Sequence, residues 1–160
     1  MRVSEHVYVP APPDRVWPLV SDPSRVLSFM SGVSRWEVAS ESPDGLGARY
    51  RMLFRIGSAD VGGLIEIVEW DPPHELAWTS VTGLDQRGRW RLREAPGNRS
   101  RVELRLAYGV AGSGIAGWVA EHVAAPTVGR HLRRSLLTVK RLVEQDEQRD
   151  RAVRRPARAG

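Results

Sequence analysis

The sequence predicts an α+β domain in which a curved antiparallel sheet of about seven strands wraps around a long C-terminal helix, with two short helices after the first strand. Three observations lead to this fold class. Apolar and polar residues alternate with a period of two through residues 3–9 and again from residue 33 onward. Turn-forming Gly, Pro, Asn and Asp interrupt the second stretch at short intervals, and residues 128–143 carry an apolar stripe at helical spacing.

The first helix follows directly on the first strand, which the alternation places at residues 3–9. Pro12 and Pro13 suit a first helical turn, where N–H donors have no partner in the helix, and Asp14 complements the positive helix N-terminus. Residues 21–23, Ser-Asp-Pro, end this helix and begin a second short one. In the second helix an apolar face is expected from Val26, Leu27 and Met30.

The alternation gives the two faces of the sheet different chemistry. One face is apolar and aromatic, with Tyr50, Met52, Phe54, Ile56, Trp90, Leu92, Val102, Leu104, Leu106 and Tyr108. The other carries arginines, namely Arg49, Arg51, Arg55, Arg87, Arg89, Arg91, Arg93, Arg101 and Arg105. Like charges on neighbouring strands are destabilising unless carboxylates lie between them, and Glu75, Glu94 and Glu103 are the candidates. We therefore predict a solvated outer face with compensated charge.

The last helix needs an apolar surface to cover. After Pro126, the stripe Val128, Leu132, Leu136, Val139 and Val143 recurs at spacings of four, four, three and four. The inner face of the sheet is the apolar surface available, so residues 1–146 are predicted to form one domain. Residues 147–160 have few apolar side chains and are expected to be a disordered basic tail.

The net charge of +5 belongs mainly to that tail. Residues 149–160 contain five arginines and one acidic residue, which leaves the rest of the chain almost neutral. The charge is thus weak evidence for a nucleic-acid partner, and none is expected.

Composition and motifs exclude several classes of chemistry. With no cysteine, the chain has no disulfide, thiolate metal ligand or cysteine nucleophile. Residues 112–117, GSGIAG, match G-x-G-x-x-G, but the second parallel strand of a dinucleotide site is missing. The four histidines form no HExxH motif and no serine lies in a G-x-S-x-G turn. Neither a cofactor nor a metal is therefore expected.

The sequence also bears on location. The N-terminal residues alternate instead of forming a charged start and an apolar block. The longest uncharged stretch, residues 106–120, has 15 residues with four glycines, too short for the roughly 20 apolar residues of a spanning helix. We expect a cytoplasmic protein without a membrane span, either a monomer or a homodimer.

Aromatic residues suggest where a ligand would bind. Six tryptophans are many for 160 residues, and core packing is their default role. A long helix lying across a strongly curved sheet, however, tends to leave a concave apolar space, and such spaces hold ligands. Polar groups to orient a ligand would come from Tyr50, Ser80, Tyr108 and His122. The predicted ligand-binding residues are Trp36, Tyr50, Met52, Phe54, Trp78, Trp90, Tyr108, Trp118 and His122.

Two segments resemble the START-like, SRPBCC superfamily, and within it the polyketide cyclase/dehydrase and lipid-transport group. They are residues 7–23, VYVPAPPDRVWPLVSDP, and residues 68–76, VEWDPPHEL, to which the amphipathic last helix adds support. The resemblance covers about residues 3–145. It implies a helix-grip fold with a deep hydrophobic cavity, in agreement with the periodicity.

Three functions remain open at this stage, because members of the superfamily include lipid carriers, hormone receptors and aromatase/cyclases. Binding of a hydrophobic small molecule or lipid between the sheet and the C-terminal helix, without catalysis, is favoured. The first alternative is a cyclase/dehydratase-like enzyme on a polyketide-like or aromatic precursor. Related cyclases use arginine and tyrosine, but the strand arginines here point outward, which leaves Tyr50, Tyr108 and His122 as catalytic candidates. The second alternative is an interaction module whose arginine face or tail docks an anionic partner.

Overall fold

The computed structural model describes the backbone of residues 1–109 and 115–155, and the side chains of residues 1–109 and 125–155. In chain order the elements are β1 (Arg2–Val9), α1 (Pro13–Val20), the 3-10 helix η1 (Pro23–Arg25), α2 (Val26–Phe29), β2 (Val33–Val38), β3 (Arg49–Ile56), β4 (Ala59–Asp71), β5 (Glu75–Ser80), β6 (Gln86–Ala95), β7 (Arg99–Tyr108) and α3 (Ile115–Arg154).

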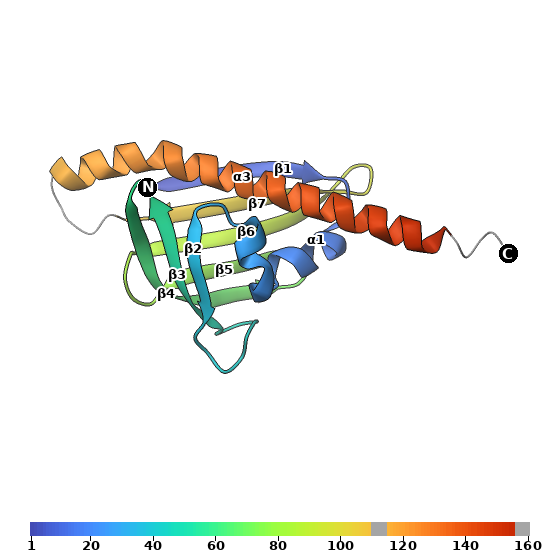
Figure 1. Ribbon diagram of the computed structural model, residues 1–160, viewed down its shortest axis with the longest axis horizontal. Coiled ribbons are helices and arrows are strands. Elements are labelled where there is room, and N and C mark those ends of the chain that lie inside the picture. The colour runs from blue at the N-terminus through green and yellow to red at the C-terminus, as the bar shows by residue number, and fades with distance from the viewer. Residues whose placement is uncertain (110–114, 156–160) are drawn as a thin grey trace.

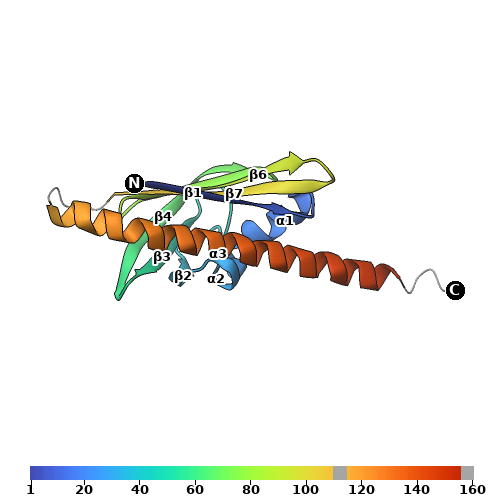
Figure 2. The same cartoon turned by 90° about the horizontal axis from the view of Figure 1, so that it is seen from above.

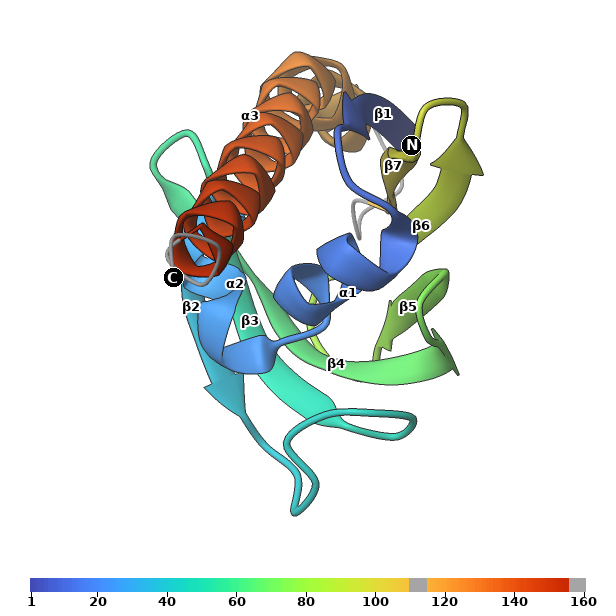
Figure 3. The same cartoon turned by 90° about the vertical axis from the view of Figure 1, so that its right-hand side faces the viewer.

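The strands form one antiparallel sheet in the order β1-β7-β6-β5-β4-β3-β2. Viewed end-on, the sheet curls into a half-barrel, and α3, α1 and α2 lie on its open side (Figure 3). This is the predicted α+β architecture, which is thereby confirmed, including the seven strands and the two short helices after β1.

The helix α3 closes the half-barrel with the predicted apolar stripe. It runs across the sheet for the whole length of the molecule (Figures 1 and 2). Its contacts reach β1, β7 and β3 as well as α1 and α2. The stripe side chains Val128, Leu132, Leu136, Val139 and Val143 are each at most 2% exposed. Burial on this scale contributes roughly 1.5–3 kcal/mol per large aliphatic side chain, so the stripe is a major source of stability.

The helix α3 extends past residue 146, where the domain was expected to end. The helix continues to Arg154, so residues 147–154 are helical and not disordered. Ion pairs with the N-terminal helices explain the extension, because Arg15 binds both Glu147 and Asp150. Residues 156–160, the end of the expected tail, lie outside the described residues.

The short helix α2 is turned differently from the prediction. Val26 and Phe29 are buried, whereas Leu27 is 57% exposed. A helix of four residues has little more than one turn, so only residues three apart face the core together. Met30, which caps the helix, is partly buried.

The outer face of the sheet carries the compensated arginines that were predicted. The Glu75 carboxylate binds Arg89 at 2.8 Å, Arg91 at 2.7 Å and also Arg93. On β7, Glu103 lies 2.8 Å from Arg101 and 2.7 Å from Arg105. The third candidate, Glu94, pairs instead with His74.

Glu75 forms ion pairs with three arginines of this outer face. Burial on its own would raise the pKa of this carboxyl, but hydrogen bonds within the cluster, including those from Arg91 and Arg93, lower it to about 2. The side chain is only 10% exposed, so water replaces these partners poorly. Glu75 of β5 therefore holds three guanidinium groups of the adjacent strand β6 together.

Replacing the charge of Glu75 tests this role. We expect Glu75→Gln to lower the free energy of unfolding by roughly 1–3 kcal/mol in urea titrations at pH 7, because three guanidinium groups lose their shared anion. The folded pKa lies below the unfolded value of about 4.3, so the stabilisation is present above about pH 4.3 and is lost as the pH falls towards 2. The matched control is Glu94→Gln, whose carboxylate is 71% exposed, with an effect within about 0.5 kcal/mol. Equal effects of the two variants would contradict the role of Glu75.

Candidate functional site

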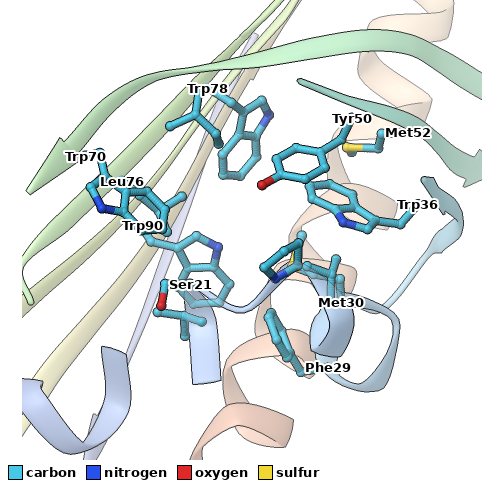
Figure 4. A pocket seen from close by; sticks show the side chains of 14 residues that line it. Ser21, Phe29, Met30, Trp36, Tyr50, Met52, Trp70, Leu76, Trp78 and Trp90 are labelled. Atoms are coloured by element: carbon cyan, nitrogen blue, oxygen red, sulfur yellow. The ribbon is translucent and has the colours of Figure 1, made fainter. Parts of the chain in front are cut away.

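The candidate site is a small space between the short helices and the concave face of the sheet, here called the aromatic pocket. One wall comes from the end of α1, from η1 and from α2, and the other comes from β2 to β6. Its volume is about 40 Å³. Figure 4 shows its aromatic rings gathered around a common centre, with Phe29 and Met30 of the α2 segment on one side. The lining residues are Val20, Ser21, Pro23, Val26, Phe29, Met30, Trp36, Tyr50, Met52, Ile67, Trp70, Leu76, Trp78 and Trp90.

The position of the pocket corrects the sequence-based expectation. The space was expected between the sheet and the C-terminal helix, but no described side chain of α3, residues 125–154, lines it. The reason is that α3 packs mainly along β1 at one side of the half-barrel, whereas α1 and α2 cover the strands further along.

The size of the pocket also differs from the deep cavity that the resemblance implied. A volume of about 40 Å³ holds on the order of a few waters, whereas pockets for drug-sized ligands measure roughly 300–1,000 Å³. Large aromatic side chains fill most of the space beneath the short helices. Phe29 meets Trp90 edge to face at 5.9 Å, and Trp17 meets Trp70 in the same way at 5.2 Å.

Two polar groups in the pocket wall have no hydrogen-bond partner. The indole Nε1 atoms of Trp36 and Trp78 are buried, and no described acceptor lies within reach of either. A buried donor without an acceptor costs roughly 1–3 kcal/mol, so native proteins seldom tolerate two in one site without a reason. An acceptor atom brought by a bound molecule would remove this cost.

Tyr50 supplies a further polar group of the pocket. Its ring stacks on Trp36 with centroids 4.5 Å apart, and its hydroxyl donates a hydrogen bond of 2.6 Å to the Pro43 carbonyl. Burial, and then the negative charge of Asp44, raises the pKa of Tyr50 to about 12. The phenol is therefore neutral at physiological pH and is poorly suited to act as a base.

Trp78 lies flat on the backbone of the neighbouring strand. Gly88 pairs with Trp78 across β5 and β6, and a Cβ atom placed on Gly88 would lie 1.9 Å from Cζ2 of the indole. Only a residue without a side chain leaves this space free. Gly88 thus sets the depth of the pocket at Trp78.

The structure separates the predicted ligand-binding residues into three groups. Trp36, Tyr50, Met52, Trp78 and Trp90 line the aromatic pocket. Phe54 and Tyr108 do not line it. The side chains of Trp118 and His122 lie outside the described residues.

The neighbours of Phe54 and Tyr108 show why these two side chains lie away from the pocket. Phe54 packs edge to face on His131 at 5.3 Å, beneath α3. The Tyr108 hydroxyl lies 3.6 Å from Sδ of Met1, and Ser80, the remaining polar candidate, accepts a hydrogen bond from the Gln86 amide. All three side chains therefore have their partners away from the pocket.

Sequence reasoning missed the half of the site that the short helices contribute. Val20, Ser21, Pro23, Val26, Phe29 and Met30 all line the pocket, and so do Ile67, Trp70 and Leu76 of the sheet. The sequence signal that could have indicated this wall was the run of apolar residues in two consecutive short helices. Their burial against the sheet depends on a long-range contact that local periodicity does not encode.

The described residues lack two features that mark other classes of protein. Among them, no three metal-ligating side chains gather in one place. No helix within the same residues is long and apolar enough to cross a membrane.

Comparison with known proteins identifies the family. Residues 1–144 match the family described as polyketide cyclase/dehydrase and lipid transport, and the chain belongs to this family. Comparison with curated protein sequences gives no match.

Solved structures support the same fold. A protein of Thermus thermophilus is 24% identical, with a TM-score of 0.78 over 91% of this chain and 99% of that one. The Zhui aromatase/cyclase from Streptomyces sp. R1128 is 18% identical, with a TM-score of 0.77 over 91% and 94%. A START superfamily protein from Mycobacterium smegmatis is 15% identical, with a TM-score of 0.67 over 90% and 97%. At these identities the likeness shows the helix-grip fold, and family and fold together fit a domain that binds a hydrophobic ligand.

The contact between Gly88 and Trp78 gives a test of the pocket geometry. We expect Gly88→Ala to lower the free energy of unfolding by about 1–3 kcal/mol, because the added methyl group displaces the indole from the sheet. The control is Gly129→Ala in α3, where the nearest atom to the new Cβ is 3.7 Å away. This change should be neutral or stabilise by roughly 0.5–1 kcal/mol. Urea unfolding measures both, and a Gly88→Ala protein as stable as the parent would contradict the described position of Trp78.

Proposed function

We propose that this protein binds a hydrophobic small molecule or lipid that carries at least one hydrogen-bond acceptor, in the aromatic pocket. The acceptor accepts from the indole N–H groups of Trp36 and Trp78, and the apolar part of the ligand packs among the aromatic rings. The observation that carries this proposal is the pair of buried, unpartnered indole donors in one apolar wall. Family membership supports the ligand class.

A ligand of useful size enlarges the pocket by moving its helical wall. The helix α2 has four residues, and its capping amide, at Met30, donates to the Val26 carbonyl at 2.8 Å. A single turn of this kind is held by packing and not by its own hydrogen bonds. Displacement of Phe29 and Met30 therefore opens the pocket at a smaller cost than any movement of the sheet.

The described side chains favour binding over catalysis. A cyclase stabilises an enolate and moves protons, and both tasks need polar groups inside the pocket. Tyr50 is the one described catalytic candidate at the pocket, and its raised pKa makes it a hydrogen-bonding group. Strand arginines such as Arg91 and Arg101 are bound to the carboxylates of the outer face, and no described arginine lines the pocket. The cytoplasmic location and the monomeric or dimeric state remain predictions.

A matched pair of ligands tests the proposal. 2-Acetonaphthalene and 2-ethylnaphthalene have nearly the same shape, but only the ketone carries an acceptor. We expect equilibrium dialysis to show binding of both, with the ketone bound roughly threefold to tenfold more tightly, since one hydrogen bond to a buried donor contributes about 0.5–1.5 kcal/mol.

Tryptophan variants assign that preference to the two indoles. Trp36→Phe combined with Trp78→Phe removes both N–H donors and should abolish the preference for the ketone. The control Trp70→Phe alters a lining residue whose Nε1 is not among the unpartnered atoms, and it should keep the preference. Failure of the parent protein to bind either compound would contradict the proposed function, and native mass spectrometry of freshly purified protein provides an independent search for a bound hydrophobic molecule.

A further inference from the structure

A second concave site lies beside the aromatic pocket, on the surface between the two helices α2 and α3. We call it the α2–α3 groove. Its volume is about 500 Å³, far larger than that of the pocket itself. Its lining residues are Leu27, Ser28, Phe29, Met30 and Ser31 on one side, and Arg134, Leu137, Thr138 and Arg141 on the other.

The groove and the aromatic pocket share a wall. Phe29 and Met30 line both of them. These are the last residue of α2 and its cap, and so belong to the segment whose movement opens the pocket. A molecule lying in the groove therefore borders the pocket directly, and a flexible chain can pass from one to the other when Met30 and Phe29 move.

The α3 side of the groove is positively charged. Arg134 and Arg141 are seven residues apart, which places them within about 20° of each other around the helix and about 10 Å apart along it. Both are exposed, and no described carboxylate forms an ion pair with either. No acidic residue lines the groove. Within the described part of α3, by contrast, Arg133 pairs with Glu5 and Lys140 lies 4.0 Å from Glu144.

The groove also exposes apolar surface. Leu27 is 57% exposed on α2, and Leu137, which lies between the two arginines on α3, is 52% exposed. The hydroxyl groups are already engaged within the protein, since Ser28 donates to the Arg25 carbonyl, Thr138 donates to the Arg134 carbonyl and Ser31 is bound to His131. The two guanidinium groups are thus the donors that remain available to an anion.

From this arrangement we propose that the ligand is an anionic amphiphile, a carboxylate with a flexible apolar chain. Its carboxylate binds Arg134 and Arg141 in the α2–α3 groove, and its chain passes Met30 into the aromatic pocket. This inference rests on the proposed function and narrows it to one ligand class. The two guanidinium groups attract the head, and the exposed leucines cover the first part of the chain.

Dodecanoate and 1-dodecanol test the charge requirement, because they share the same chain and differ in the head group. Both are used as monomers below the concentration at which they aggregate. We expect the parent protein to bind dodecanoate at least tenfold more tightly than 1-dodecanol at low salt, with the preference decreasing as salt is added. Dodecanoate should also displace 2-acetonaphthalene, since its chain enters the same pocket.

Charge variants locate the preference. Arg134→Gln combined with Arg141→Gln should weaken dodecanoate binding about fivefold to twentyfold and leave 1-dodecanol binding unchanged. The control Arg130→Gln combined with Arg149→Gln removes two exposed arginines of the same helix that do not line the groove, and it should bind both compounds like the parent protein. Circular dichroism confirms that each variant keeps its helix content.

The outcomes separate this inference from the function on which it rests. If the parent protein binds 1-dodecanol and 2-acetonaphthalene but shows no preference for dodecanoate, the proposed anionic head group is wrong. Binding of a hydrophobic ligand in the aromatic pocket is then retained. Binding of dodecanoate without displacement of 2-acetonaphthalene overturns the path past Met30. Binding confined to anionic vesicles, without binding of the monomeric carboxylate, overturns the proposal in favour of a membrane-docking surface. If no apolar compound binds at all, the proposed function itself fails.

Discussion

The packing of the apolar stripe of α3 into the half-barrel is the interaction on which the rest of the structure depends. A sheet curved as strongly as this one leaves its concave face open, and a single long helix is the element that reaches from one end to the other. Leu132 and Leu136 at the centre of the stripe are 2% and 1% exposed, so the contact is dry. Ion pairs from Arg15 to Glu147 and Asp150 hold the far end of the helix against α1. The helix thus fixes both the core and the position of the short helices.

Because α3 packs mainly along β1, it leaves the more distant strands to other elements. The short helices α1 and α2 cover this part of the concave face, and they are too short to fill it as a long helix would. Aromatic rings occupy most of the remaining space, and the unpartnered indole groups of Trp36 and Trp78 mark where the filling is incomplete. A wall of one short helical turn next to a nearly filled pocket fits the proposal that the pocket opens to admit its ligand.

Much of the fold could be predicted, because its elements follow from local patterns. The alternation around Tyr50 and Trp90 placed both rings on the inner face, and the spacing from Val128 to Val143 predicted the apolar stripe that the last helix buries. The site was harder to predict. Of the predicted ligand-binding residues, Trp36, Tyr50, Met52, Trp78 and Trp90 line the aromatic pocket, whereas Phe54 and Tyr108 are buried elsewhere, against His131 and Met1. The direction of a strand side chain follows from the local alternation of the strand. Its distance from a cavity depends on contacts between segments far apart in the sequence.

By itself, then, the sequence determined the type of most elements, the buried face of β3, β6 and β7, and the arginine surface that Glu75 and Glu103 compensate. These follow from periods of two and 3.6 residues and from charge alternation, which are properties of neighbouring residues. Only the tertiary structure decided that α2 forms the pocket wall, that the pocket is small, and that Arg134 and Arg141 flank a groove beside it. Those facts depend on distances between segments about 100 residues apart, such as Ser31 and His131, which no local pattern specifies.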